Sequence, residues 1–244
     1  MFSTFSNATT YDITVSGGDA IWLAGRTDLV IPPAGVIWPG GLARHPTTPE
    51  LIQETLPPGI SVSGGDVVRV LDPAIGGISF FNGFGGTIYG PDGNGLPGDS
   101  TLGSFGGISG YKGTQGALAG VFLDDSIPNG AAPASLDFSL TGLGIEFTTL
   151  SPDLQQVFFI GDGVTSGNIF QEFTAPTGAT RVFFGVTDGF AFVGPPGAYD
   201  DNDGLYRIRV GVNQIPDPIP EPTTMLLFGT GIAGLAAVGR RRRS

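Results

Sequence analysis

The chain has 244 residues with 42 glycines and 20 prolines, contains no cysteine, and carries a formal net charge of −11 at pH 7. The lack of cysteine excludes disulfides, thiolate metal sites and cysteine nucleophiles, and the acidic balance disfavours nucleic acid as a partner because a negative surface repels phosphates. Glycine and proline break helices, whereas a hydrophobic content of 40% is enough to build a folded core.

Short apolar runs bounded by Gly, Pro, Asn or Asp recur along the chain and are typical of β-strands. No long stretch of helical periodicity interrupts them before the C-terminal tail, so we expect an all-β protein with one core, built as an antiparallel β-sandwich. The expected strands are Tyr11–Val15, Ile21–Leu23, Val67–Leu71, Ile78–Phe81, Leu118–Leu123, Gln156–Ile160, Arg181–Val186 and Leu205–Val210.

An oxygen-rich stretch lies between the last two expected strands. It contains Asp188 and, after a Gly-Pro-Pro-Gly insert, Asp200, Asp201, Asn202 and Asp203. Calcium takes roughly six to eight oxygen ligands, and a loop that curls back between two strands can supply several of them. The same residue types also favour solvated hairpin turns. The residues alone therefore leave a calcium site and a plain turn as open alternatives.

The composition changes after Val212. Residues 213–219 are spaced by prolines and predict an extended linker. The tail, residues 220–244, opens with Pro220, Glu221 and Pro222. We therefore expect an ectodomain over residues 1–212, followed by a linker and a separate C-terminal unit.

The tail has the composition of a short membrane helix. Residues 223–239 are apolar and as a helix would rise about 25 Å, the short end of what spans a bilayer. The run is followed by four arginines, Arg240, Arg241, Arg242 and Arg243. The positive-inside rule places these arginines in the cytoplasm and the acidic domain outside. A buried core helix is the weaker alternative, since it would not be apolar all round and then end in four like charges.

Pro-Glu-Pro, a glycine-interrupted apolar stretch and a terminal arginine cluster together resemble the PEP-CTERM sorting signal of Gram-negative bacteria. The resemblance implies cleavage near residues 220–222 by an exosortase-type membrane protease, after transient anchoring in the inner membrane through residues 223–239. The mature protein would then belong to the cell envelope or the extracellular matrix. Residues 1–7 lack the signal peptide that export requires. Either the true start lies upstream, which the complete tail favours, or the protein is not exported.

The ectodomain, from about residue 64 to residue 212, resembles the galactose-binding-like domains of PEP-CTERM proteins, which are similar to calcium-dependent galactophilic lectins. The stretches that carry this resemblance are Gly90–Gly93, Gly116–Asp125, Gln156–Gly163 and Gly178–Phe190. The resemblance implies a jelly-roll-like β-sandwich and one calcium ion that bridges the protein and sugar hydroxyls.

Carried over position by position, the lectin ligands correspond to Asp188, the carbonyl of Ala198, Asp201 and Asn202, and a further carbonyl would fall near Phe81 or Asn82. Two departures matter: residues 193–197 lengthen the loop, and Asp201 stands where the family has an asparagine. The added carboxylate favours calcium, whereas the insert puts sugar access in doubt. The family's sugar-contacting histidine is absent around residues 96–99, so sugar specificity does not carry over.

The sequence thus predicts a calcium-dependent carbohydrate-binding module displayed outside the cell, with a glycan or exopolysaccharide as its partner. The alternative is a structural envelope or biofilm matrix protein without a specific ligand. The two differ in whether aromatic side chains, with Phe190, Phe192 and Tyr199 as candidates, surround the oxygen-rich loop. We expect no enzymatic activity, because Walker, His-Glu-x-x-His and serine-elbow motifs are absent. A glycan-processing enzyme would need two convergent carboxylates in a cleft.

Overall fold

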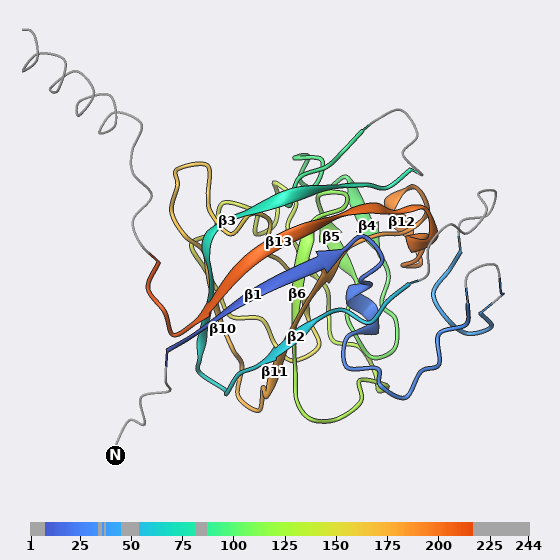
Figure 1. Ribbon diagram of the computed structural model, residues 1–244, viewed down its shortest axis with the longest axis horizontal. Helices are drawn as coiled ribbons and strands as arrows, with labels where there is room; N and C mark the ends of the chain where they lie inside the picture. The colour runs from blue at the N-terminus through green and yellow to red at the C-terminus, as the bar shows by residue number, and fades with distance from the viewer. Residues whose placement is uncertain (1–7, 34–35, 37, 45–53, 82–86, 217–244) are drawn as a thin grey trace, which may run out of the picture.

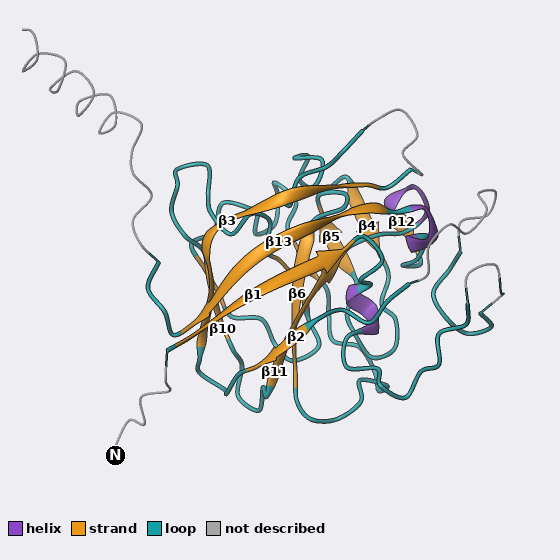
Figure 2. Cartoon of the chain, viewed as in Figure 1, coloured by secondary structure: helices purple, strands orange, loops and turns teal. Residues whose placement is uncertain are grey.

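The computed structural model describes residues 8–33, 36, 38–44, 54–81 and 87–216. Within this part the chain is all-β, as the sequence predicts, and its strands form three sheets (Figure 1). The helical segments of the described residues are single 3-10 turns (Figure 2), namely η1 (Ile21–Leu23), η3 (Phe190–Phe192) and η4 (Tyr199–Asp201).

The largest sheet contains the two longest strands. Its order is β1–β13–β3–β10–β8, formed by Thr9–Ser16, Asp203–Val212, Val67–Ser79, Glu172–Thr174 and Thr149–Leu150. Strand β13 pairs with β1 from Thr9↔Val212 to Ser16↔Leu205, and with β3 along its whole length. The last strand of the domain therefore lies inside the sheet, between the first strand and β3.

Two four-stranded sheets complete the fold. One has the order β2–β11–β6–β9, formed by Gly59–Ser61, Arg181–Val186, Leu118–Leu123 and Val157–Phe159. The other has the order β12–β4–β5–β7, formed by Val193–Gly194, Ser100–Leu102, Tyr111–Gly113 and Leu136–Asp137. The expected antiparallel pairing holds for the long strands but is wrong for three short pairs, β10–β8, β12–β4 and β5–β7, which are parallel.

The predicted strand Ile21–Leu23 is wrong, because these residues form the turn η1. The Leu23 N–H donates to the Ala20 carbonyl, and all three side chains of the turn are fully buried. Trp22 donates its indole N–H to the Ser109 carbonyl at 2.8 Å. A short apolar run does not distinguish a strand from a buried helical turn, and here tertiary packing selects the turn.

The predicted strands Val67–Leu71 and Ile78–Phe81 are parts of one strand, β3, which ends at Ser79. The Asp72-Pro73 sequence between them indicates a turn, but the register against β13 shifts around Arg209 instead. The Ala74 N–H turns away from the ladder and donates to the Asp162 carbonyl at 2.8 Å. A bulge of this kind accommodates a proline, which has no N–H to donate, without ending the strand.

One buried apolar cluster joins the sheets, in agreement with the expected single core. Phe158 of β9 stacks on Phe122 of β6, with ring centroids 5.1 Å apart. Phe158 also contacts Phe173 of β10 at 5.1 Å, across from one sheet to the other. These aromatic contacts hold the five-stranded sheet against a four-stranded one.

In the described part of the chain, none of the helices has the length and apolar character needed to cross a membrane. The predicted membrane helix over residues 223–239, the arginine cluster and the Pro-Glu-Pro motif lie outside the described residues.

Candidate functional site

The oxygen-rich stretch connects β11 to β13 at the end of the domain opposite to the C-terminal exit (Figure 1). Asp188 follows β11 after one residue, and the chain then passes through η3, β12 and η4 before it enters β13. Ala198 adopts a left-handed backbone with φ of 61°, immediately before η4. This turn returns the chain to Asp188, where the Gly197 N–H donates to the Asp188 carbonyl at 3.1 Å.

The structure brings the predicted ligand residues together and buries them. Asp188 is 2% exposed, Asp201 is 6% exposed and Asn202 is 1% exposed. Asp188, Ala198 and Asp201 line one pocket of about 210 Å³. Asn202 is not among the residues that line this pocket. Its side chain donates an N–H to the Gly17 carbonyl at 2.9 Å, which fixes its orientation.

Several oxygens of this cluster are buried without a hydrogen-bond partner. Asp188 Oδ1 accepts the Gly189 N–H at 2.7 Å. Asp188 Oδ2, Asp201 Oδ1 and Asn202 Oδ1 are buried and accept no hydrogen bond of normal geometry, although the Asn202 side chain lies close enough to Asp188 to lower its pKa. A buried acceptor without a partner costs free energy, and this cost is larger for a carboxylate. Three such oxygens from one loop are therefore unusual for a plain turn.

The raised pKa values of Asp188 and Asp201 also indicate a site that favours a bound cation. Burial raises the pKa of Asp188 well above its ordinary value, although the Asn202 side chain and the Gly189 N–H oppose the shift. Burial, followed by repulsion from Asp200, raises the pKa of Asp201 to about 7. Both carboxylates are thus held in surroundings that disfavour negative charge, which a bound cation would relieve.

The donor set limits which cation could bind. In the part of the chain that the structure describes, no three His, Cys, Asp or Glu side chains form a group that could hold a metal. A cation here would depend on two carboxylates together with neutral oxygens, from the Asn202 amide and the Ala198 carbonyl. Calcium accepts such mixed oxygen sets and completes its coordination with water or ligand hydroxyls.

Aromatic rings surround the carboxylates in this pocket. Phe80, Phe81, Phe190 and Phe192 line it beside Asp188 and Asp201. Of the three rings predicted from the sequence, only Phe190, at 50% exposed, is open to solvent; Phe192 is 3% exposed. Tyr199 is fully buried and donates its hydroxyl to the Val186 carbonyl at 2.7 Å, so it supports the loop and offers no stacking face.

Sequence reasoning missed the rings of Phe80 and Phe81. These residues follow β3 and pack on Phe192 with ring centroids 5.6 Å and 6.2 Å away. The sequence predicts only the end of a strand at this Phe-Phe pair. The rings share a pocket with Asp188, which is distant in the sequence, so local sequence patterns do not reveal the contact. Asn82, the other position considered for a carbonyl ligand, lies outside the described residues.

The remaining oxygen-rich segments form turns. Asn94 Oδ1 accepts the N–H groups of Leu96 and Gln115, both at 3.1 Å. Asp124 Oδ1 accepts the Ser126 N–H at 2.9 Å. The bonds from Leu96 and Ser126 are local and stabilise turns, whereas the bond from Gln115 ties the Asn94 turn to a segment 21 residues further along the chain. The loop between β11 and β13 differs from these turns because it buries carboxylate and amide oxygens without hydrogen-bond partners.

Comparison with known proteins identifies the C-terminal tail. Residues 218–243 match the family model of the PEP-CTERM protein-sorting motif. This motif indicates an exported protein that an exosortase processes and that is located in the cell envelope or outside the cell. No curated protein and no solved structure matches the chain.

Proposed function

We propose that the β-domain of this exported, exosortase-processed protein binds one calcium ion through Asp188, Asp201, Asn202 and the Ala198 carbonyl, and holds a carbohydrate through that ion and the neighbouring rings. The observation that carries the proposal is the set of three buried, unpartnered oxygens on Asp188, Asp201 and Asn202. The resemblance to calcium-dependent lectins supports the same ligand positions, and a jelly-roll-like sandwich would be the corresponding fold.

The pocket supports the carbohydrate part of the proposal through its mixed lining. A sugar needs polar partners for its hydroxyls and an aromatic face for its C–H groups. Open coordination positions on calcium would take hydroxyls, and the half-exposed ring of Phe190 would supply the face. A bound calcium ion would neutralise the negative charge of the buried Asp188 and Asp201 carboxylates.

Calorimetric titration of calcium into the chelator-treated, processed form of the protein tests the metal site. We expect saturable binding of one ion per chain and a higher melting temperature, because a ligand that binds only the folded state stabilises it, by about 2.7 kcal/mol at a hundredfold excess over Kd. Asp201→Asn should weaken calcium binding at least tenfold. The matched control is Asp203→Asn, which removes an exposed carboxylate at the start of β13 and should change affinity little.

The absence of calcium binding at millimolar concentration would contradict the metal site. For the carbohydrate, a glycan array probed with calcium and again with chelator should give calcium-dependent signals that Phe190→Ala abolishes while calcium affinity persists. Calcium binding without any glycan signal would favour the alternative, a structural envelope or biofilm matrix protein in which the ion only stabilises the loop.

A further inference from the structure

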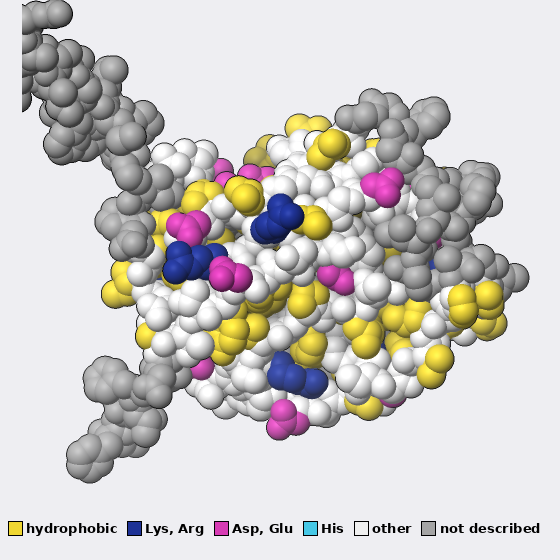
Figure 3. Space-filling view, in the orientation of Figure 1, with side chains coloured by type: hydrophobic (Ala, Val, Ile, Leu, Met, Phe, Trp, Pro, Cys, Tyr) yellow, Lys and Arg dark blue, Asp and Glu magenta, His cyan; other side chains and the backbone are white. Residues whose placement is uncertain are grey.

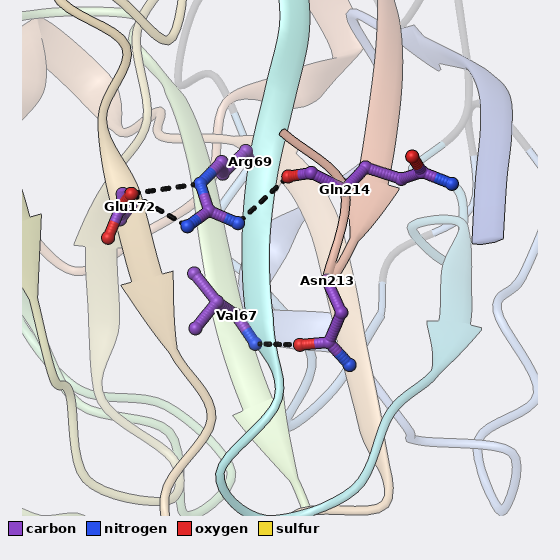
Figure 4. Close-up of polar contacts among 5 residues, drawn as sticks. All are labelled: Val67, Arg69, Glu172, Asn213 and Gln214. Carbon is purple, nitrogen blue, oxygen red and sulfur yellow. Dashed lines mark hydrogen bonds and ion pairs between the residues drawn. The ribbon is translucent and has the colours of Figure 1, made fainter. Parts of the chain in front are cut away.

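After the end of β13, Asn213 and Gln214 remain hydrogen-bonded to the domain. Asn213 has a left-handed backbone, with φ of 55°, and its N–H donates to the Val67 carbonyl at 2.8 Å. Its side-chain Oδ1 accepts the Val67 N–H at 2.9 Å (Figure 4), and its Nδ2 donates to Asp66 Oδ1 at 2.9 Å. One asparagine therefore makes three hydrogen bonds to the start of β3.

The next residue is held by an arginine of β3. Arg69 donates from Nη1 to the Gln214 carbonyl at 2.8 Å, and from Nε and Nη2 to Glu172 Oε1 at 3.0 and 2.7 Å (Figure 4). The Arg69 side chain is only 14% exposed. Glu172 of β10 thus orients the guanidinium, and the guanidinium holds Gln214. We call these residues the exit clamp: Asp66, Val67, Arg69, Glu172, Asn213 and Gln214.

The last two residues of the exit clamp, Asn213 and Gln214, lie a few residues before the Pro-Glu-Pro sequence. Ile215, the next residue, is 86% exposed. Five residues, 215–219, separate Gln214 from Pro220. At full extension five residues reach at most about 18 Å. Because Arg69 holds Gln214, these five residues are the length of chain between the last clamped residue and Pro220.

We infer that the exit clamp is a positioning device for exosortase processing, which sets the length of free chain that the membrane protease can use. The domain is held together by a single apolar core and cannot follow the chain into a protease active site, which needs extended backbone. Asn213 and Gln214 would add free chain if they were released, but three side-chain hydrogen-bonding groups hold them in the domain. The inference rests on the sorting function that the tail indicates.

The inference is tested in the full chain by shortening the segment before Pro220 and asking whether release of the clamp restores processing. An export signal is supplied at the N-terminus, the host is a Gram-negative bacterium that makes an exosortase, and mass spectrometry of the C-terminus measures the fraction without its tail. Deletion of Ile215 and Pro216 should lower that fraction several-fold. Adding Arg69→Met and Asn213→Gly, which free two residues while glycine keeps the left-handed backbone, should restore most of it.

Arg209→Met in the same deletion background is the control, because it breaks an exposed ion pair with Asp72 on β3 and leaves the clamp intact. It should restore nothing. The clamp variant must also keep the melting temperature of the natural chain, because unfolding of the domain would itself lengthen the free chain. Hydrogen exchange should show the Val67 N–H protected in the natural chain and open in the clamp variant, which lacks the Asn213 side-chain acceptor, and Asn213→Gly alone serves if the double variant does not fold.

Two results would overturn the inference: undiminished processing of the deletion variant, or a folded, clamp-released variant that stays unprocessed. If the natural chain itself keeps its tail while a known sorting substrate is processed in the same cells, the sorting function fails and the inference fails with it. The two failures are therefore distinguishable.

Discussion

Among single residues, Asp92 and Asp162 form a pair of acidic residues outside the loop that connects β11 to β13. Asp92 Oδ1 accepts the Asp162 N–H at 2.8 Å, and both residues line a pocket of about 130 Å³ with Glu146. Burial raises the pKa of Asp92, with a further contribution from Glu146. Burial and then repulsion from Asp92 and Glu146 raise the pKa of Asp162 to about 6, although the Val164 N–H opposes the shift. The folded domain therefore binds a proton here more tightly than the unfolded chain does.

This pair predicts how stability depends on pH. A carboxyl whose pKa is raised by folding contributes stability below its unfolded pKa, near 4, and loses that contribution as pH rises through about 6. Asp92→Asn keeps the acceptor oxygen and removes the repulsion, so it should raise the free energy of unfolding at pH 7 by about 1 kcal/mol after solvent screening, and less at pH 4. Urea titrations at both pH values measure the difference.

Asp99→Asn, which removes an exposed carboxylate from the same loop, is the control for that experiment. An equal gain from both substitutions, or the same gain at pH 4 as at pH 7, would mean that Asp162 is not the group responsible. Both titrations should be made in the presence of chelator, so that calcium does not contribute to the comparison.

At the scale of elements, β3 and β13 approach closely where β3 contains glycine. Gly76 has φ of 115° and pairs with Tyr206. A Cβ atom at this position would collide with the Leu205 carbonyl oxygen. Gly76 therefore allows β3 to continue past the bulge at Pro73, which is why one long strand forms where the sequence predicts two.

Gly76→Ala should lower the free energy of unfolding by more than the left-handed backbone alone costs, which is about 1–2 kcal/mol. Gly65→Ala provides the matched control, since Gly65 also has a positive φ, of 90°, but a Cβ there would meet nothing within 4 Å. Denaturant unfolding of both variants separates backbone strain from the steric collision. Equal losses in the two variants would contradict the predicted collision with Leu205.

At the scale of the whole molecule, the exit clamp and the candidate calcium site lie at opposite ends of β13 (Figure 1). Ten strand residues, Asp203–Val212, separate them, which corresponds to about 30 Å. Attachment through the C-terminal tail would therefore hold the pocket away from the membrane. On the face formed by β1, β13 and β3, charged side chains are few, and basic and acidic side chains are interspersed (Figure 3). The face drawn there has no continuous patch of one charge.

A single core predicts a single unfolding transition. Fluorescence of the two tryptophans, Trp22 and Trp38, and far-UV circular dichroism should give the same denaturation midpoint, because both indoles pack in or against the one apolar cluster that the sheets share. Phe158→Ala, which removes the ring between Phe122 and Phe173, should cost about 3–5 kcal/mol and shift both signals together. Phe190→Ala, at a half-exposed ring, should cost far less. Separate midpoints for the two signals would indicate that the sheets unfold independently.

The sorting tail and the all-β class could be predicted without a structure, because both depend on composition and on the order of residues along the chain. The sequence also placed Asp188, Asp201 and Asn202 in one candidate loop, since those residues lie near one another in sequence. Tertiary structure alone decided that Ile21–Leu23 forms a buried turn, that Phe80 and Phe81 line the pocket, and that Arg69 reaches Gln214. The physical reason is that these features depend on contacts between distant segments, whose packing and hydrogen bonds outweigh the local preferences visible in the sequence.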